Sequence, residues 1–129
     1  MKMKNALSMN QNRDFLRLYR GGGSLVSPLL VTYAKRSGKK DLRRIGITAT
    51  KKVGGAVQRN RAKRLIRAAW REAEPNVPYG WDFVFVARGR TTGAKMQQVQ
   101  AVMADQLRRL TDRRTENRPK KKNHEQKKS

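Results

Sequence analysis

The sequence contains no cysteine, a single histidine and only nine acidic residues among 129. The absence of cysteine excludes disulfides and thiolate metal sites, and it favours a cytoplasmic location. A hydrolytic site built from protein side chains needs clustered carboxylates for metal ions or a pair of histidines for proton transfer. The acidic residues are instead scattered, and His124 stands alone near the end of the chain. We therefore expect no catalytic residues and no metal or other cofactor bound by the protein alone.

Long apolar runs and nucleotide-binding loops are also missing. No stretch approaches the roughly 18 apolar residues of a membrane span, and residues 1–12 lack the apolar centre of a signal peptide. There is no G-x-x-x-x-G-K loop, so a nucleotide site is not indicated.

Positive charge dominates what is present, because 32 Lys and Arg residues give a formal net charge of +23. Such an excess destabilises the compact state by self-repulsion unless a polyanion neutralises it. We expect that polyanion to be a nucleic acid, since release of its condensed counterions favours binding. An anionic membrane surface or an acidic protein partner are the alternatives.

Residue patterns predict three helices and four strands. Helices are expected over residues 11–20, 56–73 and 94–110, and strands over residues 25–26, 29–35, 44–50 and 81–88. This order predicts one α+β domain over residues 10–110, a two-layer α/β sandwich. The strands that flank the long helix can pair in parallel through it. We expect a flexible N-terminus over residues 1–9 and a disordered basic tail over residues 111–129.

The helix expected over residues 56–73 is amphipathic, and its polar face carries only positive charge. That face holds Asn60, Lys63, Arg64, Arg67 and Arg71. No acidic residue lies between Lys51 and Arg71, whereas solvated helices usually pair Glu with Lys four residues apart. Like charges at this spacing destabilise the isolated helix, and an external anion would reverse the effect.

The residue types on this face suit phosphate. A guanidinium binds phosphate through two parallel hydrogen bonds, which an ammonium cannot do. The preceding turn brings Lys51, Lys52 and two glycines to the helix N-terminus, where the helix dipole also favours anions. Asn60 can bind a phosphate, a 2′-hydroxyl or a hydrated metal ion, or it can be unused.

The segment over residues 51–67, KKVGGAVQRNRAKRLIR, resembles the signature of the bacterial ribonuclease P protein family, called the RNR motif. The core of the motif is Arg59-Asn60-Arg61. The segment shows no departure from the signature, and the resemblance extends over roughly residues 12–110. Residues 12–15 resemble the first helix of the family, and residues 82–88 resemble its fourth strand.

The resemblance implies a fold and a function. The fold is a four-stranded mixed sheet with three helices on one side and a left-handed βαβ crossover, similar to the second domain of a small-subunit ribosomal protein. The function is that of an accessory subunit in a ribonucleoprotein endoribonuclease, which removes the 5′ leader of precursor tRNA. Its partners are the catalytic ribonuclease P RNA and precursor tRNA, with no membrane and no small-molecule substrate. Catalysis then resides in the RNA, with Mg²⁺ in the RNA-containing holoenzyme.

The resemblance also implies two RNA-binding surfaces. The surface for the catalytic RNA comprises Lys51, Lys52, Arg59, Asn60, Arg61, Lys63, Arg64, Arg67 and Arg71. The open sheet face and the first helix form a cleft for the single-stranded leader, with Phe15, Tyr19, Tyr33 and Thr48. Aromatic rings suit this role because they stack on bases. Packing against the sheet is the competing interpretation for Phe15 and Tyr19, and we expect Trp70 and Trp81 to lie in or beside the core.

Two other functions remain open at this point. A ribosomal or ribosome-assembly protein that binds rRNA would explain the charge, the size and the tail, but not the long motif. A peripheral membrane protein would need large apolar residues opposite the charges of one helix. The side of the long helix opposite its charged face is instead rich in alanine, which suits packing on a sheet.

Overall fold

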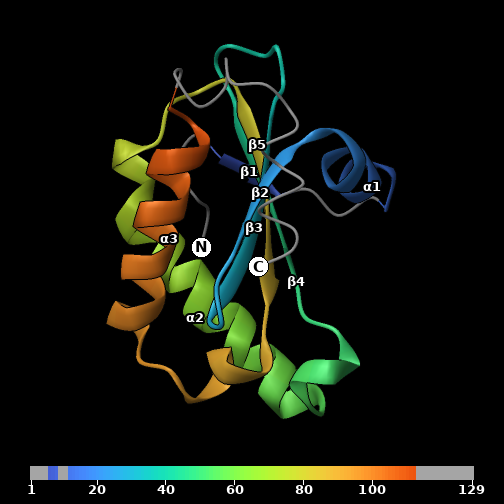
Figure 1. The fold of residues 1–129 in the computed structure, drawn as a ribbon, viewed down its shortest axis with the longest axis vertical. Coiled ribbons are helices and arrows are strands. Elements are labelled where there is room, and N and C mark those ends of the chain that lie inside the picture. Colours follow the sequence, from blue (N-terminus) through green and yellow to red (C-terminus); the bar gives the residue numbers. More distant parts are fainter. Residues whose placement is uncertain (1–5, 9–11, 113–129) are drawn as a thin grey trace.

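The computed structural model describes residues 6–8 and 12–112 of the chain. In this part of the chain, two long helices cover one face of a sheet, and a short helix lies against the other face (Figure 1). The strands are β1 (Ala6–Ser8), β2 (Gly23–Val26), β3 (Leu30–Arg36), β4 (Arg43–Thr48) and β5 (Trp81–Ala87). The helices are α1 (Asn12–Gly21), α2 (Ala56–Ala73) and α3 (Met96–Leu110), with 3₁₀ turns η1 (Lys51–Val53), η2 (Glu74–Asn76) and η3 (Gly89–Gly93).

The sheet is mixed, with the strand order β1-β4-β5-β3-β2. Strands β4 and β5 are parallel and are linked through α2, as the sequence predicts, whereas β3 runs antiparallel to both β5 and β2. The four expected strands are therefore present in a mixed sheet. The left hand of the crossover stays a prediction from the family resemblance.

The N-terminal strand β1 departs from the predicted flexible segment over residues 1–9. Ala6 and Ser8 pair in parallel with Arg43 and Ile45 of β4. Three residues are too few to show a strand alternation, and the hydrogen-bonding partner is distant in the sequence, so no local signal marks this strand. Most of the predicted basic tail, residues 113–129, lies outside the described residues.

The main core lies between the sheet and the two long helices. Trp70 of α2 is fully buried and packs against Phe83 and Phe85 of β5, with ring centroids 5.9 and 5.8 Å apart. Burial of each such side chain contributes about 1.5–3 kcal/mol. Trp81 is buried in the same core, so the prediction for both tryptophans is confirmed.

A buried polar pair fixes α3 on this core. The hydroxyl of Thr32 donates to Oε1 of Gln106 at 2.7 Å, and Nε2 of Gln106 donates to the backbone oxygens of Leu30 and Leu25 at 3.0 and 3.3 Å. Because its polar atoms are paired, this glutamine can lie in the apolar stripe of α3 without a large desolvation cost.

The helix α1 lies on the opposite face, which corrects the expectation that all helices share one side. Its Leu18 and the facing Val84 of β5 are fully buried, and Phe15, Tyr33 and Val86 pack around them. Successive residues of a strand point to opposite faces, so Val84 faces α1 while its neighbours Phe83 and Phe85 face α2. The continuous apolar run of β5 reflects this burial on both faces.

None of the described helices has the length and apolar character that crossing a membrane would require.

Candidate nucleic-acid interface

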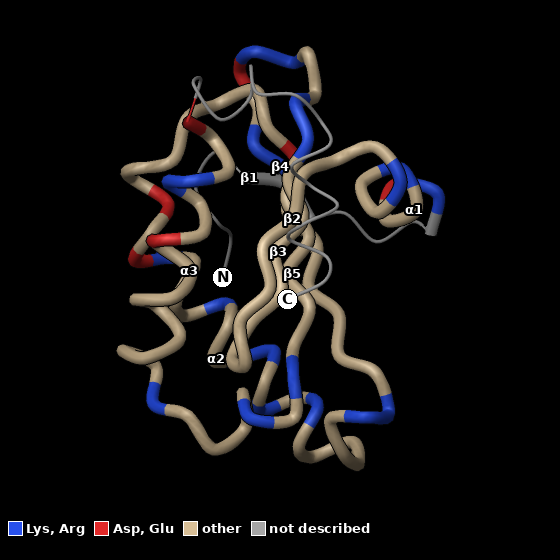
Figure 2. Tube along the Cα trace, in the orientation of Figure 1, with Lys and Arg blue, Asp and Glu red and all other residues tan. Residues whose placement is uncertain are grey.

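The face of α2 that points away from the core is cationic, as the helical spacing predicts. Residues buried against the sheet are Ala62, Ile66, Ala69, Trp70 and Ala73. Asn60, Arg61, Arg64 and Arg71 are exposed, and Arg59, Lys63 and Arg67 are half-buried. In Figure 2, the lower end of the molecule, where α2 begins, carries Lys and Arg without any Asp or Glu.

Among the described residues, Arg59 and Arg61 of the RNR core form side-chain hydrogen bonds only to backbone carbonyls. Nη1 of Arg59 donates to the carbonyl of Gly54 at 2.9 Å, and Nε of Arg61 donates to the carbonyl of Thr92 at 3.1 Å. No carboxylate forms an ion pair with a cation of α2 in the part of the chain that the structure describes. The charge of this face is therefore not neutralised by these residues.

Lys51 and Lys52 lie on the turn η1, directly before α2. Val53 is buried and anchors the turn, while the hydroxyl of Thr50 accepts a hydrogen bond from the backbone N–H of Lys52 at 3.3 Å. Both lysine side chains are exposed. The turn thus presents two cations beside the cationic face of α2.

Phe15, Tyr19 and Tyr33 form an aromatic cluster between α1 and the sheet. The ring centroids of Phe15 and Tyr19 are 6.5 Å apart, and those of Tyr19 and Tyr33 are 4.7 Å apart in an edge-to-face arrangement. Phe15 and Tyr33 are half-buried, and Tyr19 is 38% exposed. Burial, followed by the proximity of Tyr33, raises the pKa of the Tyr19 hydroxyl. The rings therefore pack on the sheet and still leave an accessible edge.

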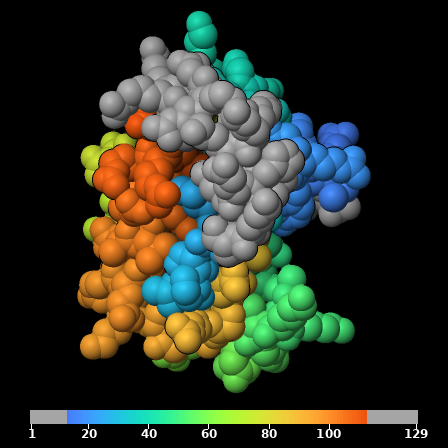
Figure 3. Space-filling view, in the orientation of Figure 1, coloured from blue at the N-terminus to red at the C-terminus, as the bar shows by residue number. Residues whose placement is uncertain are grey.

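Thr48 lies on the same sheet face as this cluster. It pairs with Val86, and two residues earlier Gly46 pairs with Val84, which in turn pairs with Tyr33. Side chains of paired residues project to the same side of a sheet, so the structure brings Thr48 and the aromatic cluster onto one face. Figure 3 shows α1 (blue) and the segment around η1 (green) projecting from the same side of the molecule.

Asp82 joins α1 to this face, and sequence patterns did not single it out. Arg44 donates to both carboxylate oxygens, from Nε at 3.0 Å and from Nη2 at 2.7 Å, and Arg17 of α1 donates to one of them. Burial alone would raise the pKa of Asp82, but the hydrogen bonds and charges of Arg44 and Arg17 outweigh it, and the pKa lies below its ordinary value. An acidic residue inside an apolar strand pattern was the available signal, because a buried carboxylate requires a partner.

Arg43 shows that not every arginine is available to an external anion. Its side chain is buried, donates to the carbonyls of Glu74 and Val77 at 2.6 and 2.8 Å, and lies 4.2 Å from the ring centroid of Tyr79. This residue connects β4 to the end of α2 and has a structural role.

The described residues contain no group of three His, Cys, Asp or Glu side chains placed to hold a metal ion. That the protein alone binds no metal stays an expectation.

Comparison with known proteins identifies relatives of the whole folded region. A family model described as Ribonuclease P matches residues 3–111. The ribonuclease P protein component of Clostridium novyi is 36% identical over 108 residues, which is 83% of this chain and 96% of the relative. That of Dehalococcoides mccartyi is 35% identical over 101 residues, covering 78% of this chain and 82% of the relative.

Solved structures of similar proteins have the same fold. The RNase P protein from Thermotoga maritima superposes with a TM-score of 0.72 at 27% identity, over 81% of this chain and 98% of that one. The Staphylococcus aureus RNase P protein gives a TM-score of 0.69 at 30% identity, over 78% and 92% of the two chains.

Proposed function

The chain belongs to the ribonuclease P protein family, and we propose that the cationic face of α2 binds the catalytic RNA of that ribonucleoprotein. The observation that carries this proposal is the row of arginines with no carboxylate partner among the described residues. RNA phosphates supply the missing countercharge, and release of counterions favours the complex. None of the relatives described above is a ribosomal protein, so we do not propose rRNA binding.

The protein acts in this proposal as an accessory subunit. Hydrolysis is performed by the RNA with bound Mg²⁺, and the protein supplies positive charge that lets the RNA keep its active fold at lower Mg²⁺ concentration. Precursor tRNA with its 5′ leader is the substrate, and the leader lies in the cleft between α1 and the open sheet face.

Processing of precursor tRNA by a ribonuclease P RNA at low Mg²⁺, with and without the protein, tests the whole proposal. We expect the protein to restore cleavage that the RNA alone loses. Cleavage that does not depend on the protein at any Mg²⁺ concentration would contradict the accessory role.

Arg64→Ala and Arg67→Ala test the surface on α2. Each variant should weaken association with the RNA, and the slope of log affinity against log salt should fall by about one unit per lost phosphate contact. Arg108→Ala is the matched control, because Arg108 is 72% exposed on α3 and pairs with Asp105. An unchanged slope in the α2 variants would show that these arginines do not contact phosphate.

Tyr33→Ala tests the leader cleft. Stacking of one base on an aromatic ring contributes about 1–3 kcal/mol, so the variant holoenzyme should lose affinity for leader-bearing tRNA by roughly tenfold. Binding of tRNA without a leader should be unchanged. An equal loss for both substrates would contradict the leader role of the cleft.

A further inference from the structure

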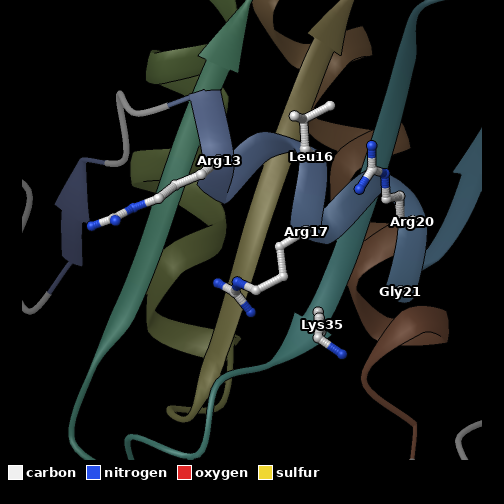
Figure 4. A pocket seen from close by; sticks show the side chains of 6 residues that line it. All are labelled: Arg13, Leu16, Arg17, Arg20, Gly21 and Lys35. Atoms are coloured by element: carbon white, nitrogen blue, oxygen red, sulfur yellow. The ribbon is translucent and has the colours of Figure 1, made fainter.

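The outer side of α1 carries an open hollow of about 480 Å³ that lies outside both surfaces described above (Figure 4). Its lining residues are Arg13, Leu16, Arg17, Arg20 and Gly21 of α1 and Lys35 of β3. Four of these six side chains are cationic and none is acidic. The hollow therefore has the chemistry of an anion site.

The sequence of α1 places these cations on one side of the helix. Residues 13, 16, 17 and 20 follow the i, i+3, i+4, i+7 spacing of a single helical face, and the row is about 10 Å long. The sheet-facing residues Phe15, Leu18 and Tyr19 lie on the neighbouring side. Like charges three and four residues apart lower the stability of an isolated helix, so the row requires an external anion to become favourable.

Charges inside the protein do not neutralise the hollow. Arg17 binds Asp82, but Arg44 binds the same carboxylate, so one negative charge is shared by two guanidinium groups. Arg13 and Arg20 are exposed, and no hydrogen bond or ion pair joins either side chain to another described residue. The hollow keeps a net positive charge that is open to solvent.

Residues of the hollow are close neighbours of the aromatic cluster along α1 and β3. Tyr19 and Arg20 are adjacent on α1 and both are exposed, and the neighbouring Leu16 is 38% exposed. On β3, Tyr33 and Lys35 point to the same sheet face, about 7 Å apart. A single strand whose bases stack on the cluster thus reaches these cations with its next phosphates. This combination of rings and flanking cations is typical of single-strand binding.

We propose that this hollow binds phosphates of the 5′ leader, upstream of the nucleotides that occupy the aromatic cleft. The inference rests on the proposed leader cleft and extends it. It assigns the hollow to the substrate rather than to the catalytic RNA, because α1 and the cationic helix α2 lie on opposite faces of the sheet (Figure 1). The consequence is that affinity depends on leader length.

The test is substrate binding by the reconstituted holoenzyme with the double variant Arg13→Ala/Arg20→Ala. Two precursor tRNAs are compared, with leaders of about four and about twelve nucleotides, which span the usual size of single-strand sites. Affinity for the long leader should fall roughly tenfold, as expected for two exposed phosphate contacts. The salt slope for that leader should fall by about 1.4 units. The affinity for the short leader should be unchanged in the double variant. The control variant Arg108→Ala should leave the affinity for both leaders unchanged.

Three results would overturn the inference. Equal losses for both leaders, or no loss for either, would show that the hollow does not bind upstream nucleotides. Weaker association of the double variant with the catalytic RNA, measured without substrate, would assign the hollow to that RNA. A second variant, Arg20→Glu, should reduce the affinity for the long leader more than the double alanine variant does. Circular dichroism should show that the fold of this variant is unchanged. Failure of the cleft itself is recognised separately, because Tyr33→Ala would then leave binding of both leaders unchanged.

Discussion

At the scale of single residues, Asp82 connects the stability of the fold with the position of α1. Its carboxylate is fully buried and is bound by Arg44 from the neighbouring strand and by Arg17 from α1. Charge-assisted hydrogen bonds of this kind are the strong ones. Asp82 therefore holds α1, and with it Phe15 and Tyr19, against the sheet.

Asp82→Asn should lower the free energy of unfolding by about 3 kcal/mol, because it removes the carboxylate that two neighbouring guanidinium groups share. Urea denaturation measures this loss. Asp105→Asn is the matched control, since Asp105 also contacts two arginines but its side chain is 45% exposed on α3, and it should cost under about 1 kcal/mol. Similar losses in both variants would show that burial of Asp82 is not decisive.

The contribution of Asp82 should also depend on pH. Its pKa in the folded state is lowered, so the stabilisation is complete above the unfolded-state pKa of about 4 and is lost as the pH falls through the folded-state value. The stability difference between the wild type and Asp82→Asn should therefore shrink in acid. A difference that stays constant from neutral pH down to about pH 3 would contradict this linkage.

Local spacing was sufficient to predict some residues and not others. The exposed row of α2 follows from helical periodicity and from the missing acids, so Asn60, Arg64 and Arg71 were placed correctly on the outer face. The ion pairs of Asp82 depend on the register of β4 against β5 and on the position of α1. Such register is fixed by tertiary packing, which one sequence does not display.

At the scale of elements, the turn from α1 into β2 depends on close backbone contact at Gly22. A Cβ atom there would lie 2.5 Å from the carbonyl oxygen of Ala34 and 2.9 Å from that of Leu18. Both obstacles are backbone atoms, so a side chain forces the elements apart. The glycine run thus lets α1 approach β3 as well as ending the helix.

Gly22→Ala should lower the free energy of unfolding by about 1–3 kcal/mol, the usual cost of overpacking. Thermal or urea denaturation measures this change. Gly93→Ala provides the control, because a Cβ at that position meets no atom within 4 Å. If Gly22→Ala were as stable as Gly93→Ala, the contact between the two elements would not be tight.

The elements themselves were largely predictable from the sequence. The three helices and the strands β3, β4 and β5 lie close to their expected bounds, because each has a long, regular pattern. The strand β1 could not be predicted, since it is only three residues long. The placement of α1 could not be predicted either, since it depends on which face of the sheet remains free.

At the scale of the whole molecule, the net charge of +23 makes the free protein sensitive to ionic strength. Self-repulsion opposes folding and is screened by salt. The thermal midpoint of the free protein should therefore rise between about 10 and 150 mM NaCl. Differential scanning calorimetry at fixed pH measures this shift, and a midpoint that falls with salt would show that internal ion pairs outweigh the repulsion.

The central strand β5 serves both faces of the molecule at once. Phe83 and Phe85 belong to the core under α2, whereas Asp82 and Val84 support α1. Deletion of one residue within this strand would move the residues that follow it to the opposite face, so that Asp82 or the phenylalanines would lie on the wrong side of the sheet. The alternation along the seven residues of β5 thus keeps the core under α2 separate from the cluster under α1.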